Sequence, residues 1–569
     1  MRYLGLATDY DGTLAHHGRV APSTVRALER AKENGRRLIM VTGRELEDLF
    51  EVFPQVDLFD RVVAENGALI YRPGTKEEKS LAEPPPPEFL EELRKRDVEP
   101  VSVGRVIVAT WQPHEIAVME AIEALGLELH IVFNKGAVMV LPSGINKAAG
   151  LQDALTELRL SAHNIVGVGD AENDHAFLSV CECSVAVANA LPTLKDRCDI
   201  VTEQPHGLGV EELISMMVDE DLGASAPRLA RHHIPIGTDE RDNPVTVPQY
   251  EPNVLLAGPS GSGKSTLNTA FLEGLLEAGY QFCLIDPEGD YSTFDGALVL
   301  GASDRPPDVD EVIRSLETTH HNVVVNLVGQ RLNDRPDFFA ALFPRLQDLR
   351  ERFGRPHWVV VDEAHHLLPS ASASGRPATA ATDVHGMFFI TIHPEHLAEW
   401  VAKAITHVVV VGKAPDATIR AVASAAGGDP PELPGDELPA GFGLMWDRST
   451  AEPAVRFRVR PPTAELQRHR RKYAQGELGD RSFYFRGPEG KLNLRAQNLQ
   501  LFLQIADGVD EETWLHHLRR HDYSNWLREA IKDDELAREA ERIEDAGLGA
   551  DESRARMRRE IEERYTLPA

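Results

Sequence analysis

The sequence predicts an α/β protein with several domains. Two stretches, residues 1–217 and 253–446, alternate short apolar runs with helical patterns. That alternation is typical of βα units on a parallel sheet. Beyond Arg460 the chain turns basic, then helical and highly charged. A chain of 569 residues has room for roughly three or four domains.

Shifts in composition indicate where one domain ends and the next begins. We expect a first domain over 1–220, a linker over 221–233, a second domain over 234–460 and a helical domain over 461–569. A run of four prolines from Pro84 to Pro87 marks either a loop or the entry into an inserted subdomain.

Charge and hydropathy limit the partners and the compartment. The formal net charge of −30 disfavours a nucleic-acid-coating role, although a local basic surface would still allow contact with nucleic acid. No apolar run approaches the ~20 residues of a membrane span, and the start of the chain lacks a signal-peptide pattern. The four cysteines form no CxxC pair and fit buried positions in a reducing compartment. We therefore expect a cytoplasmic protein without a membrane partner.

The first chemical motif is Asp9-Tyr10-Asp11-Gly12-Thr13-Leu14, directly after an apolar run. Asp9 is expected at the carboxyl end of a parallel strand, where open α/β sheets bind ligands. An aspartate carboxylate there can attack phosphorus and form an aspartyl-phosphate. Asp11 points to the same side and can protonate the leaving alkoxide, then activate water. A solvated Asp-Gly turn is the alternative interpretation of this motif alone.

Further groups follow in an order that favours phosphoryl transfer. Thr42 comes after a second apolar strand and can donate its hydroxyl to a phosphoryl oxygen. Lys147, ahead of a helical pattern, can neutralise charge on the transferring group. Asp170 and Asp174 follow another apolar run and offer hard oxygen ligands suited to Mg²⁺. Each residue alone could be a solvated surface group, whereas the ordered set favours one site.

This set resembles the haloacid-dehalogenase (HAD) phosphatase superfamily over about residues 1–217. Glu65-Asn66-Gly67-Ala68 and Val187-Ala188-Asn189-Ala190 are similar to its Cof-like subgroup. The resemblance implies a Rossmann-like core with a small α/β cap, expected at about 80–140 within the first domain, and a phosphorylated small molecule as substrate. It also implies Asp9 as the nucleophile and Asp11 as the general acid and base.

The same resemblance implies a magnesium site and a cap that selects the substrate. Mg²⁺ would be bound by Asp9, Asp170 and the backbone carbonyl of Asp11. Asp174 and Asn173 would support these ligands. Candidate substrate contacts from the cap are Arg105, His114, Asn134 and Lys135.

The second chemical motif fits G-x-x-x-x-G-K-[ST] between an apolar strand and a helical pattern. Its backbone N–H groups would hold the phosphates of ATP, Lys264 would reach the β and γ oxygens, and Ser265 would bind Mg²⁺. The nucleotide-binding set is Gly258, Gly261, Ser262, Gly263, Lys264, Ser265 and Thr266.

A second apolar strand ends in an acidic pair that could complete an ATP-hydrolysing site. Asp362 would hold the water shell of Mg²⁺, and Glu363 would polarise the attacking water. With 284–291 and 388–394, these motifs resemble the HerA/FtsK-type branch of P-loop ATPases over about 234–450. That branch usually has a glutamine near the position of His393, and this chain does not.

The second resemblance implies a ring in which neighbouring subunits complete each ATP site. We therefore expect a homo-oligomer, with a hexamer as the expected form. Three interpretations of the whole chain stay open. The ATPase regulates or assembles a Mg²⁺-dependent metabolic phosphatase; it translocates DNA beside a nucleic-acid-directed phosphatase; or the chain is an analogue of polynucleotide kinase-phosphatase. The acidic charge favours the first interpretation over the second.

Overall fold

The computed structural model divides into two compact units. The first comprises 1–264, 274–292 and 296–459, and the second comprises 265–273, 293–295 and 460–569. The structure describes residues 1–223, 232–249, 252–259, 261–368, 384–412, 414–426, 428–433, 437–450, 452–463, 482–531 and 533–565. Most of the expected linker at 221–233 lies outside these ranges. Within them, no helix is long and apolar enough to cross a membrane.

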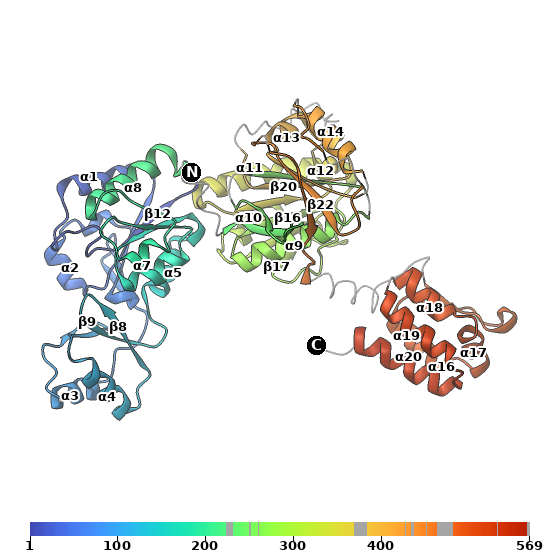
Figure 1. Ribbon diagram of the computed structural model, residues 1–569, viewed down its shortest axis with the longest axis horizontal. Helices are drawn as coiled ribbons and strands as arrows, with labels where there is room; N and C mark the ends of the chain where they lie inside the picture. The colour runs from blue at the N-terminus through green and yellow to red at the C-terminus, as the bar shows by residue number, and fades with distance from the viewer. Residues whose placement is uncertain are drawn as a thin grey trace. The chain divides into compact units, whose positions relative to one another are not determined.

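The first sheet of unit one has eight strands in the order β12-β11-β10-β1-β2-β3-β4-β5 (Figure 1). Pairing is parallel from β12 to β3 and antiparallel from β3 to β5. Strand β1 is central, and all four of its residues are buried, as its apolar run predicts. The strands are β1 (Gly5–Thr8), β2 (Arg37–Val41), β3 (Arg61–Ala64), β4 (Leu69–Arg72), β5 (Glu77–Ser80), β10 (Ile165–Gly169), β11 (Cys183–Ala186) and β12 (Ile200–Val201).

Six helices accompany this sheet, and α1 and α8 lie side by side (Figure 1). They are α1 (Pro22–Glu33), α2 (Leu46–Val52), α5 (Lys147–Leu158), α6 (His175–Val180), α7 (Pro192–Lys195) and α8 (His206–Glu220). This is the parallel α/β arrangement that the alternating pattern predicts, and it fits the Rossmann-like core that the resemblance implies.

The inserted cap is a small antiparallel sheet in the order β6-β7-β9-β8. Its strands and helices are α3 (Pro87–Lys95), β6 (Ser102–Val103), β7 (Val108–Trp111), α4 (Glu115–Leu125), β8 (Leu129–Asn134) and β9 (Ala137–Pro142). Figure 1 shows α3 and α4 on the side of β8 and β9 away from the core sheet. Phe89, Leu93 and Val118 pack there against Val138 and Val140.

The second sheet of unit one has eleven strands in the order β14-β13-β23-β22-β21-β15-β20-β19-β16-β18-β17. Pairing is parallel from β21 to β17 and antiparallel from β21 to β14. The strands are β13 (Ile234–Thr238), β14 (Pro244–Val247), β15 (Asn253–Ala257), β16 (Phe282–Asp286), β17 (Ala297–Leu300), β18 (Asn322–Asn326), β19 (Trp358–Val361), β20 (Met387–Thr391), β21 (His407–Val411), β22 (Phe442–Asp447) and β23 (Val455–Val459). The helices of unit one here are α10 (Val309–Leu316), α11 (Arg335–Phe353), α12 (Ala364–Leu367), α13 (Glu399–Ala404) and α14 (Pro415–Ala425). Helix α9 (Lys264–Ala278) begins and ends in unit one, while its residues 265–273 belong to unit two.

The carboxyl-terminal part of unit two is helical, as its spacing predicts. It contains β24 (Phe483–Phe485), β25 (Leu494–Ala496), α16 (Leu499–Gly508), α17 (Glu511–Leu518), α18 (Asp522–Trp526), α19 (Asp534–Asp545) and α20 (Ala550–Tyr565). Its core is aromatic: the ring of Trp514 stacks on Tyr523 at 4.5 Å, and Phe502 stacks on Trp526 at 5.0 Å.

Candidate active site

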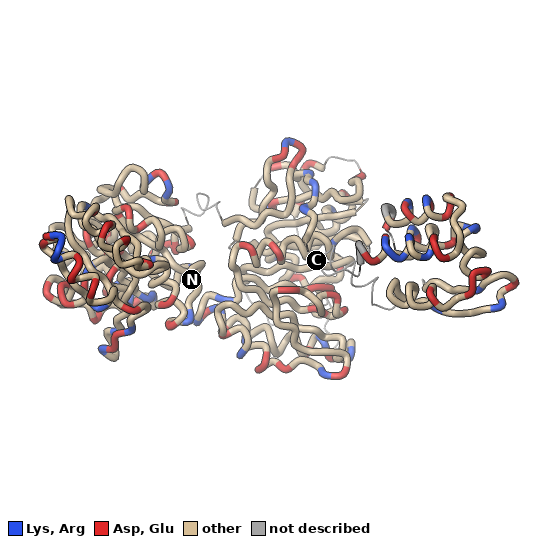
Figure 2. The backbone as a smooth tube through the Cα atoms, turned by 90° about the horizontal axis from the view of Figure 1, so that it is seen from below, with Lys and Arg blue, Asp and Glu red and all other residues tan. Residues whose placement is uncertain are grey.

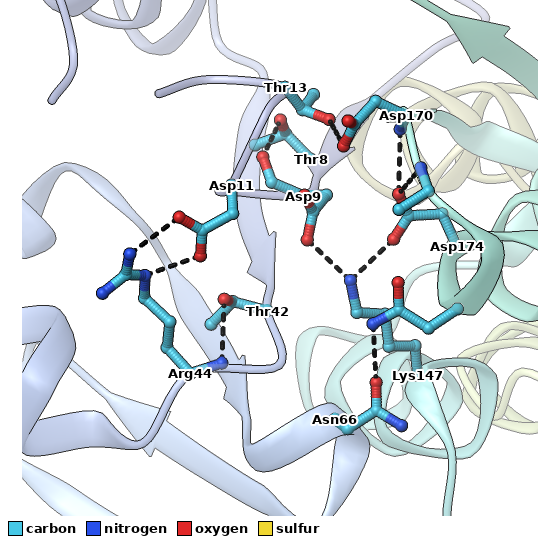
Figure 3. Close-up of polar contacts among 12 residues, drawn as sticks. Thr8, Asp9, Asp11, Thr13, Thr42, Arg44, Asn66, Lys147, Asp170 and Asp174 are labelled. Carbon is cyan, nitrogen blue, oxygen red and sulfur yellow. Dashed lines mark hydrogen bonds and ion pairs between the residues drawn. The ribbon is translucent and has the colours of Figure 1, made fainter. Parts of the chain in front are cut away.

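The first motif lies at the carboxyl end of β1, between the ends of β2 and β10. The side chain of Asp9 is buried there, while that of Asp11 is partly exposed. Figure 3 shows the two carboxylates pointing in different directions, Asp9 toward Lys147 and Asp11 toward Arg44. The sheet thus brings together groups that are far apart in the sequence.

Lys147 joins two buried carboxylates. Its Nζ donates to Oδ1 of Asp9 and to Oδ1 of Asp174, both at 2.6 Å. Lys147 is only 1% exposed, and it begins α5, whose N-cap Asn146 accepts the N–H groups of Ala148 and Ala149. Burial and the negative charge of Asp174 raise the pKa of Asp9, although Lys147 opposes this shift. Burial alone would lower the pKa of Lys147, but Asp174 and Asp9 outweigh it and raise that pKa.

Three buried carboxylates could hold a divalent cation. One oxygen from each of Asp9, Asp170 and Asp174 lies within 4.8 Å of the others. With the carbonyl of Asp11, these donors are all hard oxygens, which fits Mg²⁺. Asp174 has other partners as well, because its Oδ2 accepts the N–H groups of Asp170 (2.8 Å) and Ala171 (2.9 Å). Asp174 therefore orients the loop that carries Asp170, which suits the supporting role expected for it.

Arg44 contacts Asp11, although we did not predict it from the sequence as a residue of the site. Its Nε donates to Oδ2 of Asp11 at 2.6 Å, and its Nη2 donates to Oδ1 at 2.7 Å. The guanidinium therefore forms a bidentate ion pair with the carboxylate of Asp11. Thr42 lies beside them, and its Oγ1 accepts the N–H of Arg44 at 3.1 Å. The signal was present in the sequence, because Arg44 lies two positions after Thr42, just beyond β2.

Glu65 is a second residue whose role the sequence did not reveal. Its buried carboxylate accepts the backbone N–H groups of Arg105, Val106 and Ile107, at 2.7 to 2.9 Å. A Cβ at Gly104 would lie 2.6 Å from this carboxylate. The carboxylate of a core loop therefore anchors a segment of the cap.

Of the four candidate cap residues, Lys135 reaches the core site. Its Nζ donates to the carbonyl of Asp11 at 2.9 Å and to Oδ2 of Asp170 at 2.8 Å. Arg105 instead bonds carboxylates outside the site, and His114 bonds the carbonyl of Glu99. For Asn134 no bond into the site is recorded among the described residues.

Comparison with known proteins assigns this region. A model of the haloacid dehalogenase-like hydrolases matches residues 6–102 and 103–214. The phosphoglycolate phosphatase 2 of Saccharolobus solfataricus is 32% identical over 225 residues, which are 38% of this chain and 94% of that protein. The chain belongs to the haloacid dehalogenase-like hydrolase family.

Two further proteins match a similar share of this chain at lower sequence identity. A phosphoglycolate phosphatase of Methanothermobacter thermautotrophicus is 29% identical over 218 residues, covering 37% of this chain and 96% of that protein. A solved haloacid dehalogenase-like hydrolase from Bacteroides thetaiotaomicron has 18% identity and a TM-score of 0.34, covering 38% of this chain and 99% of that chain.

The resemblance expected over about residues 1–217 is confirmed at the level of a HAD-type phosphoric monoester hydrolase. The family model ends at residue 214. The ATP-hydrolysing domain expected in the rest of this haloacid dehalogenase-like hydrolase therefore stays a prediction.

The second motif follows β15 in this hydrolase. Gly261 and Gly263 have φ angles of 75° and 100°, which the backbone of residues other than glycine rarely adopts. Lys264 begins α9, and its Nζ donates to the carbonyls of Gly258 (2.9 Å) and Pro259 (3.0 Å). Burial lowers the pKa of Lys264, although the charges of Glu363 and Asp362 oppose the shift.

The acidic pair follows β19, which β20 separates from β15. Burial raises the pKa of Asp362 to about 8, with further contributions from Glu363 and Asp286. The Oε2 of Glu363 lies 3.4 Å from Nδ1 of His365. His393 lies beyond the end of β20 and is 3.1 Å from the carboxylate of Glu395. These groups therefore line the same edge of the sheet as the glycine-rich loop.

Proposed function

We propose that residues 1–214 hydrolyse a small phosphomonoester that carries a carboxylate, such as 2-phosphoglycolate, through an aspartyl-phosphate on Asp9. Two relatives named as phosphoglycolate phosphatases support the substrate class. The observation that carries the reaction is the buried contact between Lys147, Asp9 and Asp174 at the end of β1. It places a carboxylate nucleophile beside a fixed positive charge.

In the first half of the reaction, Oδ of Asp9 forms a bond to phosphorus as the bond from phosphorus to the ester oxygen breaks. The carboxyl group of Asp11 gives its proton to the departing alkoxide. Lys147 holds Asp9 in place and offsets the negative charge near the phosphoryl group. Thr42 offers a hydroxyl that can donate to a phosphoryl oxygen.

In the second half, water attacks the phosphorus of the aspartyl-phosphate, and Asp11 accepts the proton of that water. The products are free Asp9 and inorganic phosphate. Mg²⁺ bound by Asp9, Asp170 and the Asp11 carbonyl would supply positive charge that stabilises the transferring phosphoryl group.

Replacing Asp9 by Asn tests this function. Asp9→Asn removes the nucleophile, and we expect kcat to fall by about four orders of magnitude or more on 2-phosphoglycolate. Phosphate release from wild type and variant would be measured beside ATP turnover, which should stay largely unchanged. Substantial phosphatase activity in the purified variant would disprove the assignment.

We infer that the second sheet carries a P-loop ATPase that regulates the phosphatase. The glycine-rich loop with Lys264, and the Asp362-Glu363 pair on the same sheet edge, support this proposal. Glu363→Gln should bind ATP normally and lose hydrolysis, because only the group that activates water is changed. Turnover equal to wild type would contradict the proposal.

DNA translocation and polynucleotide kinase-phosphatase activity are the competing functions. Figure 2 shows acidic positions distributed over each described region, in keeping with the net charge of −30. That distribution favours a regulatory role over a role on nucleic acid. ATP turnover that rises with added DNA would support translocation, and transfer of the γ-phosphate to an oligonucleotide would support the kinase.

We also propose that the ATPase acts as a homo-oligomeric ring, with a hexamer as the expected form. Light scattering with Mg²⁺ and a non-hydrolysable ATP analogue would measure the mass of the assembly. A monomer whose ATPase activity does not depend on protein concentration would exclude the ring.

A further inference from the structure

The cap presents a lysine at the tip of a tight hairpin. Strands β8 and β9 are joined by Lys135 and Gly136, since Asn134 already pairs with Ala137. Both turn residues have positive φ, 49° and 90°. Such turns favour Asn and Gly, because an L side chain at positive φ crowds its own backbone. The lysine is thus unfavourable for the turn itself, which indicates a role for its side chain.

The ammonium group of Lys135 bonds the core rather than the cap. Its partners are the Asp11 carbonyl at 2.9 Å and Oδ2 of Asp170 at 2.8 Å. Asp170 is 4% exposed, so the half-exposed lysine reaches a buried carboxylate. The contact joins the tip of the cap directly to the catalytic loop.

Gly12 leaves the space in which this contact forms. It has a φ of 88°, and a Cβ at this position would lie 2.6 Å from Nζ of Lys135 and 2.3 Å from Oδ2 of Asp170. A side chain at residue 12 would therefore exclude the ammonium group. The catalytic loop and the cap hairpin fit each other at this point.

The Asp11 carbonyl and the Asp170 carboxylate, which Lys135 contacts, belong to the groups that fit Mg²⁺. Mg²⁺ binds oxygens at about 2.1 Å, so a metal on these groups would crowd the ammonium group that bonds them. Repulsion between the two cations strengthens this exclusion. Once released, the ammonium group stays beside the site on its short hairpin.

We propose that Lys135 competes with Mg²⁺ for the Asp11 carbonyl and Asp170, and that the displaced ammonium group then binds the substrate carboxylate. Binding of the substrate carboxylate rests on the proposed function, whereas competition with Mg²⁺ does not. Lys135 thereby couples metal loading to recognition of an anionic group next to the phosphate.

The first experiment measures Mg²⁺ binding by calorimetry with the full chain and no substrate. Lys135→Asn removes the charge and suits the positive φ, so the fold should persist. We expect Mg²⁺ to bind this variant roughly 5- to 100-fold more tightly than wild type. The matched control is Lys76→Asn, because Lys76 is also an exposed lysine with positive φ (59°) between two strands. Equal Mg²⁺ affinity in wild type and Lys135→Asn would overturn the competition.

The second experiment compares two substrates that differ in the carboxylate, 2-phosphoglycolate and ethyl phosphate. We expect Lys135→Asn to lower the ratio of their kcat/KM values by about tenfold, mainly through KM, while Lys76→Asn leaves the ratio unchanged. An unchanged ratio in Lys135→Asn would overturn the carboxylate contact. If wild type hydrolyses neither substrate, the proposed function fails, and the Mg²⁺ titration still decides the competition.

Discussion

Each of the two sheets of unit one places a buried lysine at the carboxyl edge of its parallel strands, but the two lysines have different partners. Lys147 bonds two carboxylates, Asp9 and Asp174, and is almost fully buried. Among the described residues, Lys264 bonds the carbonyl oxygens of its own loop, those of Gly258 and Pro259. The pKa shifts go in opposite directions, upward for Lys147 and downward for Lys264.

The two sites balance the positive charge of their lysine in different ways. The first site balances its buried positive charge with negative charges of the protein itself, so it is organised in advance (Figure 3). Among the described residues, the bonds of Lys264 go to neutral carbonyls, so an incoming polyphosphate would improve its electrostatics most. The first lysine should therefore matter for stability and catalysis, and the second mainly for binding.

The largest effect is expected at Lys147. Lys147→Met leaves Asp9 and Asp174 buried without their shared counter-charge, which should destabilise the protein by about 3–5 kcal/mol. Phosphatase kcat should also fall by about a thousandfold or more. Urea unfolding and phosphate release would measure both. Adding Asp174→Asn should restore part of the stability and none of the activity, whereas a fully stable single variant would contradict the comparison.

The matching change at Lys264 should act on binding alone. Lys264→Met removes bonds to neutral carbonyls, so we expect a stability change below about 1 kcal/mol. ATP affinity should fall roughly a hundredfold, because the charged contact to the phosphates is lost. Unfolding curves and nucleotide titrations would show this. A stability loss as large as that of Lys147→Met would remove the distinction between the two sites.

The carboxylate of Glu182 joins the two sheets of unit one through hydrogen bonds to residues that precede a strand of each. Its buried carboxylate accepts bonds from Arg2 (2.7 Å), Tyr280 (2.9 Å) and His163 (2.8 Å). Burial would raise the pKa of Glu182, but the bond from His163 and the charges of His163 and Arg2 outweigh it and hold that pKa well below the usual range. This carboxylate therefore stabilises the fold above its unfolded pKa of about 4.3, and the contribution is lost as pH falls toward the folded value.

Glu182→Gln should reveal this contribution. At pH 7 we expect the variant to be less stable by about 3 kcal/mol, because Arg2 loses its buried partner. The difference from wild type should shrink as pH falls below about 4. Thermal unfolding between pH 3 and pH 8 would test it, and a difference that does not depend on pH would show that the charge of Glu182 is not the cause.

The smallest effect is expected at Arg44. Arg44→Gln frees the carboxylate of Asp11, so proton transfer to a poor leaving group should slow by about tenfold. An aryl phosphate with a good leaving group needs little protonation and should be hydrolysed at nearly the wild-type rate. Comparing kcat for the two substrates separates a positioning role from a loss of fold. Equal losses on both substrates would contradict the positioning role.

The sequence alone determined the strand-end motifs of both sheets. Asp9 and Asp170 each directly follow an apolar strand, and Lys147 lies at the start of a helical pattern. The carboxyl ends of parallel strands lie along one edge of a sheet. Their meeting in one site was therefore predictable from order and periodicity. The helical carboxyl-terminal region was predictable for local reasons, since apolar spacing and charge mark it in the sequence. The small cap was expected from the family resemblance, and its antiparallel strand pairing was not predicted.

Only the tertiary structure decided which partners these groups take. Three hydrogen bonds join residues between 33 and 42 positions apart in the sequence. They run from Arg44 to Asp11, from the backbone of Ile107 to Glu65, and from Lys135 to Asp170. The hydrophobic periodicity of the sequence shows on which face of a helix or strand a residue lies, because this periodicity depends on local backbone geometry. Partners depend on how the cap hairpin and the core loops pack in space, and no local pattern in the sequence encodes that packing.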